Sequence, residues 1–368
     1  MNDAPIQVTK TYLPTLEEYS ALLETVWESQ WVTNGGPLVR QLESTLSGRL
    51  AASTQVVSNG TVALQLAVRA LELSGSVITT PFSYVATTNA LLWEQLTPLF
   101  VDVEPEWFTL DPSLVEDAIR DDTTAILATH VYGYPCQHRR LAEIAQRRGL
   151  ALIYDAAHAF DVCVGGQSVL GWGDISTLSF HATKVFHTIE GGGVVTRDAA
   201  LAEKVDLMRT FGHRGNAYLD VGINGKNTEF HAAIGLLNLA KLEANRGARR
   251  RISDTYRELL TKLPLRTLDP DRYPDLDYNY AYFPVFCNSE AAREEIIDRL
   301  NERQIYPRRY FDPSLNELPF LSEESRCSCP VSERAARTVV CLPLYADLAM
   351  DDVQRICSII RKSVSQWA

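Results

Sequence analysis

The sequence predicts an α/β fold with a mostly parallel sheet in a large domain, followed by a smaller α+β domain. Between about residues 55 and 200, short runs rich in Val, Ile and Leu alternate with helical patterns of about ten residues. A long helical stretch over 228–263 then leads into a region rich in Tyr and Pro at 269–286. We therefore expect a large domain over 1–245, with an N-terminal helical segment, and a smaller domain over 246–368.

The predicted units follow one another along the chain. Apolar strand-like runs lie at 53–57, 76–80, 96–103, 124–132, 150–160 and 175–178, and the helical patterns between them lie at 61–73, 84–94, 110–119 and 139–149. The stretch Glu190–Gly193 turns the chain back into a further strand, which the helical pattern at 199–212 follows. In the second region, 290–300 and 351–360 have helical patterns.

Composition excludes several classes of protein. The 368 residues carry a formal net charge of −11, which argues against a general nucleic-acid binder because such proteins need clustered positive charge. The one basic run, Arg246–Arg251, lies inside a helical pattern and is interpreted as a solvated helix face. No stretch approaches the roughly twenty apolar residues that span a bilayer, so we expect no membrane partner.

Cysteine usage and the N-terminal residues predict a cytoplasmic location. The seven cysteines are irregularly spaced and odd in number, which is typical of reduced thiols. The N-terminus lacks the basic start and apolar run of a signal peptide. Cys327 and Cys329 form a CxC pair without a second pair or a nearby histidine, so no metal site is predicted.

Polar residues follow several predicted strands, and the carboxyl ends of parallel strands are where such sheets bind ligands. In SNGTVAL, residues 58–64, a strand gives way to a helix whose free N–H groups could hold a phosphate. An ordinary N-cap by Asn59 or Thr61 explains the same pattern. Asp155 ends an apolar strand, where a carboxylate needs a cationic partner such as a protonated cofactor nitrogen, a buried arginine or a helix cap.

The stretch SFHATKVFHTIEGGGVV, residues 179–195, places Ser179 at a strand end and Lys184 five residues later. A partly desolvated lysine has a lowered pKa, and its neutral amine can attack a carbonyl. A surface lysine beside a glycine hairpin is the alternative. Tyr84 follows another strand and could stack on a planar ring or pack in the core. Together, a phosphate cradle, a flat aromatic residue, a buried carboxylate and a lysine nucleophile are what pyridoxal 5′-phosphate requires.

Several stretches carry a family resemblance, including WVTNGGPLVRQLE, SNGTVALQLA, PFSYVATTNA, DAAHAF, SFHATK, EGGG and GINGKNTEFHAAIGLLNL. Over essentially its whole length the chain resembles the DegT/DnrJ/EryC1/StrS family of sugar aminotransferases, which are pyridoxal-phosphate enzymes of fold type I. The resemblance implies transamination from L-glutamate to a nucleotide-linked keto sugar. It is strongest to enzymes that aminate C4 of dTDP-4-keto-6-deoxyglucose.

The resemblance also implies a role for individual residues. Lys184 would be the catalytic lysine that joins to the cofactor, and Asp155 would contact the pyridine nitrogen. The other implied cofactor contacts are Gly60, Thr61, Tyr84, His158, Ser179 and, from the neighbouring subunit of a homodimer with shared active sites, Asn224. Lys226 stands where many relatives carry Arg. Candidate substrate contacts are His187, Arg308 and Tyr310.

Other functions stay open from the sequence alone. A C3 keto-sugar or keto-cyclitol aminotransferase and a non-catalytic binding or regulatory relative share the same motifs. Relatives that replace the lysine with histidine act as dehydratases, so Lys184 favours transamination. A dinucleotide-binding oxidoreductase is disfavoured because no GxGxxG joins a first strand to a helix.

Overall fold

The structure is a computed structural model that describes residues 4–364. Its centre is a seven-stranded sheet of strand order β2-β10-β9-β6-β5-β3-β4, in which β10 is antiparallel to both neighbours and the remaining pairs are parallel. The strands are β2 (Ser53–Val57), β3 (Ser76–Thr79), β4 (Thr97–Phe100), β5 (Thr123–Thr129), β6 (Ala151–Asp155), β9 (Ile175–Ser179) and β10 (Gly192–Thr196). The predicted mostly parallel sheet is therefore confirmed.

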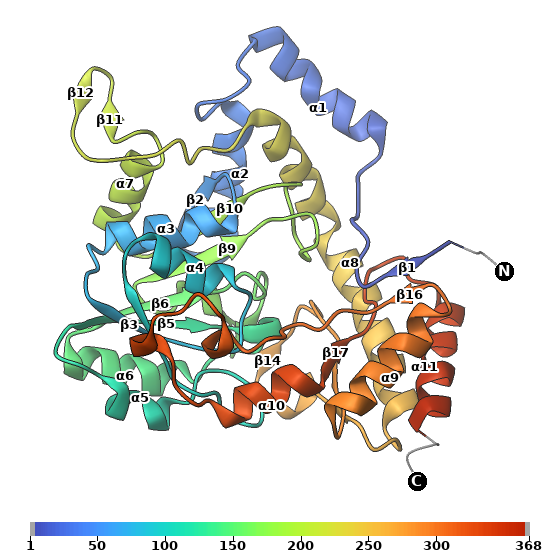
Figure 1. The fold of residues 1–368 in the computed structure, drawn as a ribbon. Coiled ribbons are helices and arrows are strands. Elements are labelled where there is room, and N and C mark those ends of the chain that lie inside the picture. Colours follow the sequence, from blue (N-terminus) through green and yellow to red (C-terminus); the bar gives the residue numbers. More distant parts are fainter. Residues whose placement is uncertain (1–3, 365–368) are drawn as a thin grey trace.

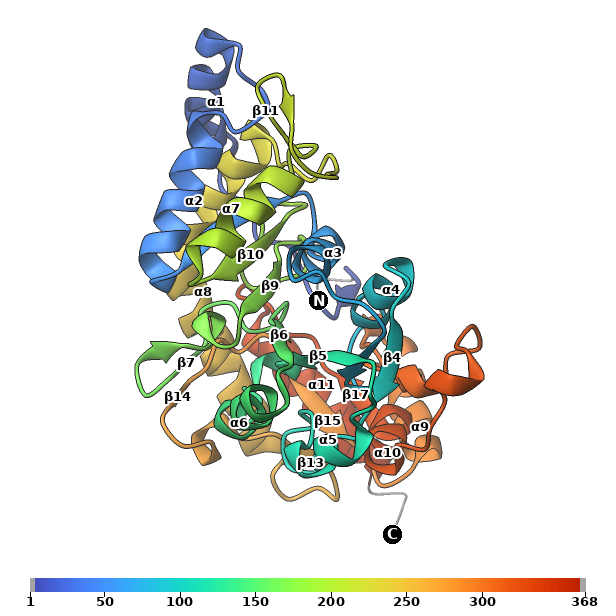
Figure 2. The same ribbon diagram turned by 90° about the vertical axis from the view of Figure 1, so that its left-hand side faces the viewer.

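Helices cover both faces of this sheet, because successive strand residues point to opposite faces and both sets are apolar. Val57 and Val77 pack beneath one group of helices, whereas Val56 and Ile78 pack beneath another. The first group is α3 (Gly60–Ala70), α4 (Ala86–Trp93) and α7 (Ala199–Met208); the second is α2 (Pro37–Leu50), α5 (Pro112–Ala118), α6 (His138–Arg148) and α8 (Glu229–Leu260). The sheet lies between α3 and α4 on one side and α5 and α6 on the other (Figure 1, Figure 2).

A second core lies at the far end of α8, where Tyr256 packs with Phe283, Ile296, Val340 and Ile356. Its elements are the antiparallel sheet β13 (Arg266–Thr267), β15 (Pro284–Phe286) and β17 (Val339–Cys341), with α9 (Glu290–Asn301) and α11 (Met350–Val364). Helix α10 (Pro330–Thr338) contacts α9 and packs in a neighbouring cluster with Phe82 and Tyr132. Helix α8 contacts α1 (Leu16–Ser29) and α2, and also α11 (Figure 1). Because α8 is continuous through residue 245, the division predicted at 245/246 stays a prediction.

Residues 6–13, called the N-terminal strap below, join the two cores. Strand β1 (Ile6–Gln7) pairs in parallel with β16 (Ile305–Tyr306), and the Leu344 N–H donates to the Val8 carbonyl at 3.0 Å. The chain then reaches α1, whose N-cap Thr15 forms a capping box with Glu18.

The remaining elements are short. They are β11 (His213–Arg214) with β12 (Ala217–Tyr218), β7 (Cys163–Val164) with β8 (Gln167–Ser168) and β14 (Leu276–Asp277), and single helical turns at Val131–Gly133, Val169–Gly171, Pro270–Arg272, Leu315–Glu317 and Glu323–Ser325. The β11–β12 hairpin projects from the body of the protein (Figure 1). Among residues 4–364, no helix has both the length and the apolar character that crossing a membrane requires.

Candidate active site

A cavity of about 310 Å³, called the first cavity below, lies at the carboxyl ends of the central strands. It receives side chains from the loops after β2 and β3, from the ends of β6 and β9, and from the C-terminal region. The structure brings together here the predicted residues Gly60, Thr61, Tyr84, Asp155, His158, Ser179, Lys184 and Tyr310.

Lys184 lies on the loop after β9, where its backbone N–H donates to the His181 carbonyl at 2.9 Å. Its Nζ donates to the Tyr282 hydroxyl at 3.3 Å. Burial lowers the pKa of Lys184 to about 8, against the opposing influence of Asp155 and Tyr84. A substantial fraction of the side chain is therefore a neutral amine near neutral pH, which makes it competent as a nucleophile and as a base.

Asp155 ends β6 with only 5% of its surface exposed. It accepts hydrogen bonds from the Thr87 hydroxyl at 2.7 Å and from the Ala157 N–H at 3.1 Å. Burial raises the pKa of this carboxyl group, whereas these two bonds and the charge of Lys184 oppose the rise. A carboxylate so enclosed gains from a cationic ligand group.

A chain of buried hydroxyls supports Asp155. Thr129 donates to Ser83 at 3.2 Å, and the Ser83 and Thr87 oxygens are 2.8 Å apart. Because Thr87 donates its one proton to Asp155, Ser83 must be the donor to Thr87. Every donor thus points toward the carboxylate, and such aligned bonds polarise one another.

The loop after β2 forms a cradle at the start of α3. The Asn59 side chain accepts from the Val62 N–H at 2.9 Å, so the N-cap that the sequence allowed is present. A Cβ added to Gly60 would lie 2.9 Å from the Ser179 Cβ, and one added to Gly192 would lie 2.4 Å from the Asn59 carbonyl oxygen. Glycine is therefore required for the close approach of β2, β9 and β10, which leaves the N-terminus of α3 and the Ser179 hydroxyl beside one another in the first cavity.

Aromatic rings line the rest of the first cavity. Tyr84 is exposed, with its ring centroid 6.5 Å from that of Phe311. His158 stacks on Phe311 at 5.4 Å and an interplanar angle of 3°. Its Nδ1 accepts from the Tyr132 N–H at 3.1 Å, and burial holds its pKa well below the usual range. His158 is therefore neutral and carries its proton on Nε2.

Three predicted residues lie outside the first cavity of this chain. Asn224 is exposed and contacts Lys226, and Arg308 is exposed beside Tyr310. His187 is buried, and its Nε2 donates to the Tyr12 carbonyl at 2.8 Å, because its Nδ1 accepts from the Ile189 N–H. Its direct contact is the N-terminal strap.

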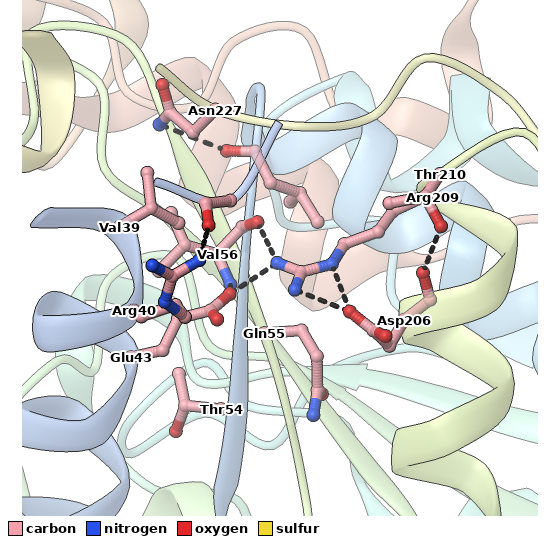
Figure 3. A network of polar contacts seen from close by, with 12 residues as sticks. Val39, Arg40, Glu43, Thr54, Gln55, Val56, Asp206, Arg209, Thr210 and Asn227 are labelled. Carbon is pink, nitrogen blue, oxygen red and sulfur yellow. Dashed lines mark hydrogen bonds and ion pairs between the residues drawn. The ribbon is translucent and has the colours of Figure 1, made fainter. Parts of the chain in front are cut away.

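The segment that carries Asn224 is held by a network around the buried Arg209 (Figure 3). The Arg209 guanidinium contacts Glu43 and donates to the Val56 carbonyl at 2.6 Å and to Asp206 at 2.6 and 3.0 Å. Its backbone carbonyl accepts from the Gly225 N–H at 3.0 Å, and the Gly225 carbonyl accepts from the Ser58 N–H at 2.8 Å. One buried cation thus fixes the segment next to the cradle.

A second cavity, of about 320 Å³, shares Lys184 with the first. It is enclosed by the N-terminal strap, by α8 and by residues 346 and 347, and it contains His187. The strap is tied to the lysine loop by the His187–Tyr12 bond and by the Thr11 hydroxyl, which donates to the Ala182 carbonyl at 3.2 Å. Lys10 forms an ion pair with Asp347 at the edge of this cavity.

Sequence reasoning missed Tyr282, Phe311, Ser83 and Thr87. All four line the first cavity or its hydroxyl chain. Thr87 and Ser83 stand in the predicted strand-to-helix junction at 79–91, so the proximity of that junction to Asp155 was the available signal. Tyr282 and Phe311 belong to the C-terminal region, and no local pattern connects them with Lys184.

The geometry suits one kind of ligand. The cradle accepts a phosphate, Asp155 accepts a protonated ring nitrogen, Tyr84 offers a face for a flat ring, and Lys184 can combine with a carbonyl. Within residues 4–364, no group of three or more His, Cys, Asp or Glu side chains could hold a metal ion.

Comparisons with known proteins agree with this geometry. Residues 15–361 match the DegT/DnrJ/EryC1/StrS aminotransferase family. The chain is 39% identical over 365 residues to the dTDP-4-amino-4,6-dideoxy-D-glucose transaminase of Shigella dysenteriae, covering 98% of this chain and 99% of the relative. It is 36% identical over 368 residues to the Escherichia coli protein of the same name, with coverage of 98% and 99%.

Solved structures show the same fold. The structure of DesI in the presence of its TDP-sugar product superposes with a TM-score of 0.93 at 33% identity, covering 99% of this chain and 94% of DesI. The structure of Streptomyces venezuelae DesV in complex with a ketimine intermediate superposes with a TM-score of 0.86 at 30% identity, with coverage of 94% of each chain. The predicted fold class is confirmed.

Proposed function

The chain belongs to the DegT/DnrJ/EryC1/StrS aminotransferase family, and on that premise we propose that it uses pyridoxal phosphate to transfer an amino group from L-glutamate to C4 of a nucleotide-linked keto sugar. The substrate we favour is dTDP-4-keto-6-deoxyglucose, which would give dTDP-4-amino-4,6-dideoxyglucose. The observation that carries the proposal is the first cavity, in which Lys184, Asp155 and the α3 cradle face the same space.

Residues of the first cavity fit the cofactor. Gly60, Thr61 and Ser179 would hold the phosphate, Asp155 would contact the ring nitrogen, and Tyr84 would lie against the ring. When bound, pyridoxal phosphate supplies an electron sink that stabilises negative charge on the substrate carbon that loses its proton.

The chain's own residues would control the protons. Lys184 has a pKa of about 8, so its Nζ can hold a proton or release it near neutral pH. Tyr282 accepts a hydrogen bond from Nζ and orients the amine. The neutral His158, with its proton on Nε2, offers one hydrogen-bond donor to the cavity without adding charge. The hydroxyl chain through Thr87 keeps Asp155 in place and favours its ionised form.

The choice of C4 rests on two relatives, 39% and 36% identical, that are both named as dTDP-4-amino-4,6-dideoxy-D-glucose transaminases. A protein of Acidithiobacillus ferrooxidans named as a UDP-N-acetyl-3-dehydro-alpha-D-glucosamine 3-aminotransferase is 32% identical over 330 residues. A C3 keto sugar is therefore the second candidate substrate.

We also propose a homodimer in which Asn224 completes the partner's site. Asn224 is exposed and lies outside the first cavity of its own chain. The neighbouring hairpin exposes Phe211, Tyr218, Leu219 and Val221, a run of apolar side chains that a partner would cover. Mixing Lys184→Ala and Asn224→Ala proteins should restore part of the activity after subunit exchange. No recovery after proven exchange, with each variant impaired alone, would contradict shared sites.

A cytoplasmic location is proposed from the thiols. Cys136, Cys163, Cys287, Cys327, Cys329, Cys341 and Cys357 are all free, which suits a reducing compartment.

The deciding experiment is an assay of the purified protein with L-glutamate and a panel of nucleotide-linked 3- and 4-keto sugars. Products are identified by mass spectrometry and NMR. We expect turnover with dTDP-4-keto-6-deoxyglucose and 2-oxoglutarate as the second product. Turnover with 3-keto sugars alone would show that the protein aminates C3 and not C4. If no keto sugar were aminated, the proposed function would be wrong.

A further inference from the structure

Within residues 4–364, Arg249 is a buried cation that pairs with no carboxylate. It lies in α8 with 6% of its surface exposed, which corrects the expectation that the run Arg246–Arg251 is a solvated face. The other strongly buried arginines differ: Arg209 contacts Glu43 and Asp206, and Arg293 contacts Asp312. A buried charge normally needs such a counter-ion, so its absence from Arg249 among the described residues requires an explanation.

The contacts of Arg249 within residues 4–364 use only Nη1, which leaves three of its five N–H donors without a partner there. Nη1 donates to the Leu344 carbonyl at 3.0 Å and, more weakly, to those of Tyr280 and Ala281 at 3.4 and 3.5 Å. Within residues 4–364, Nε and Nη2 make no hydrogen bond. Arg249 lines the second cavity, so the guanidinium has unused donors at its wall.

Other unused polar groups lie on the same wall. Asn238 is buried, with 5% of its surface exposed, and its Oδ1 has no hydrogen-bond partner among the described residues. Its Nδ2 donates to the His187 carbonyl at 2.9 Å, which fixes the orientation of the amide. Asn245, one turn before Arg249, lines the cavity with a side chain that makes no hydrogen bond in the described part of the chain.

The charges of the second cavity match an anion of one charge. Its lining has two cations of its own, Arg249 and Lys10, and one carboxylate, Asp347. Lys184 also lines it but is shared with the first cavity. A carboxylate is planar and accepts two parallel hydrogen bonds, which suits the free edge of a guanidinium. The carboxylate of Asp347 disfavours a more highly charged group such as a diphosphate.

The second cavity is adjacent to the first and shares Lys184 with it. Lys184 lines both cavities, and its Nζ donates to the Tyr282 hydroxyl. Arg249 is close enough to Tyr282 to lower the pKa of that hydroxyl, against the larger rise that burial causes. Arg249 Nη1 also reaches the Ala281 carbonyl, one residue before Tyr282, so Tyr282 connects the Arg249 wall with the lysine amine.

We propose that the second cavity binds a carboxylate of the amino donor, an α-amino acid, with Arg249, Asn245 and Lys10 as its donors. The inference rests on the proposed function, since only an aminotransferase needs such a donor. The His187–Tyr12 bond holds the strap that closes the cavity, which makes His187 a positioning residue.

Glutarate, which has no amino group to transfer, tests the cavity by isothermal titration calorimetry with the full-length protein as purified. The first variant, Asn245→Leu, removes an amide that makes no hydrogen bond among the described residues. The second, Arg249→Lys, keeps the positive charge and removes the paired N–H donors of the guanidinium. Arg250→Met is the control, since Arg250 is an exposed neighbour on the same helix. We expect both test variants to weaken glutarate binding about tenfold or more, the scale of a lost hydrogen bond to a charged group.

Steady-state kinetics on the same proteins separate donor from acceptor. The KM for L-glutamate should rise in parallel with the loss of glutarate affinity, whereas the KM for the keto sugar should stay within about twofold. Wild-type protein that binds no glutarate, or an Asn245→Leu variant with unchanged glutarate affinity, would overturn the inference. If the two variants lost affinity for dTDP and kept their affinity for glutarate, the second cavity would be a phosphate site, and this result would also overturn the inference.

Failure of the proposed function gives a different result. A protein that aminates no keto sugar, yet binds glutarate in a manner that depends on Asn245 and Arg249, would keep the carboxylate site and remove the acceptor substrate. If the protein aminates the sugar and the two variants leave the KM for L-glutamate unchanged, the proposed function stands and the carboxylate site is disproved.

Discussion

The two cavities that meet at Lys184 are built in different ways. The first is assembled from loops that follow the strands of one sheet, and its buried carboxylate, Asp155, already accepts hydrogen bonds from Thr87 and Ala157. The second is assembled from the N-terminal strap, α8 and residues 346 and 347, and Arg249 and Asn238 retain unused hydrogen-bonding atoms. The comparison teaches that the buried carboxylate of the first cavity has its partners within the chain, whereas the buried cation of the second has no carboxylate partner among the described residues.

The largest effect should come from the residue common to both cavities. Lys184→Ala removes the amine that combines with the cofactor and moves the proton, so turnover should fall by about 10³-fold or more. The assay is the release of 2-oxoglutarate from L-glutamate in the presence of keto sugar. Lys204→Ala, a lysine on α7 that pairs with Glu72, is the control. Full turnover of Lys184→Ala would contradict the mechanism.

Asp155→Asn should affect the first cavity alone. Turnover should fall roughly 10²-fold or more, the scale of losing one pre-organised electrostatic group, whereas glutarate affinity should stay unchanged. Burial raises the pKa of this carboxyl group in the folded protein above its value in the unfolded chain. In the cofactor-free protein, the free energy of unfolding therefore falls as the pH rises from the unfolded value through the folded one.

Thermal unfolding at several pH values measures how Asp155 affects the stability of the cofactor-free protein. Cofactor-free Asp155→Asn should therefore be more stable than cofactor-free wild type at pH 8, and the difference should shrink toward pH 4. A variant that is less stable at pH 8 would show that the carboxylate is a structural requirement.

The pH dependence of Lys184 follows from a pKa of about 8. The rate at which added pyridoxal phosphate combines with cofactor-free protein should rise about tenfold per pH unit below 8 and level off above it, because only the neutral amine reacts. Since the ordinary value is 10.5, the unfolded chain binds more protons between about pH 8 and 10.5, and this lysine adds stability as pH rises through that interval. A midpoint near 10.5 would show that the amine is not desolvated.

Thr87→Val removes the donor that ends the hydroxyl chain at Asp155, while its shape is nearly kept. The dissociation constant of pyridoxal phosphate should rise about tenfold, the scale of one hydrogen bond to a charged group. Thr87→Ser retains the hydroxyl and should bind the cofactor nearly as wild type does. Fluorescence titration of cofactor-free protein measures both, and equal losses in the two variants would indicate a packing effect.

The smallest effect is expected at the rim of the second cavity. Lys10 and Asp347 form an ion pair between exposed side chains, and such pairs are weak. Lys10→Met should raise the KM for L-glutamate only about threefold, without changing the KM for the keto sugar. An effect larger than that of Asn245→Leu would place the carboxylate at the rim in place of the Arg249 wall.

Much of the first cavity could be predicted because its residues follow predicted strands. Asp155 and Ser179 stand at the ends of β6 and β9, and topology alone brings such positions to one edge of a sheet. Tyr282 and Phe311 could not be foreseen, because they reach the cavity through tertiary packing of a region that has no strand in the central sheet.

The second cavity could not be predicted for a related reason. Arg249 stands in a run of arginines on one helix, and the residue types do not reveal which of them points inward. The same limit applies to the strap, since residues 6–13 have no periodic pattern and their path is fixed by contacts with distant segments, among them β16, Leu344 and His187. The division into domains at 245/246 and the roles of the individual site residues stay predictions.

The path of the strap has a practical consequence for work with this protein. Ile6 pairs with Ile305 in β16, and the Tyr12 carbonyl accepts the His187 hydrogen bond, so residues 6–13 are tied to both cores of the protein. An affinity tag fused directly ahead of Ile6 would crowd that pairing and disturb the second cavity. The protein should therefore be produced with a C-terminal tag or a cleavable one, and kinetic values for glutamate should be compared before and after its removal.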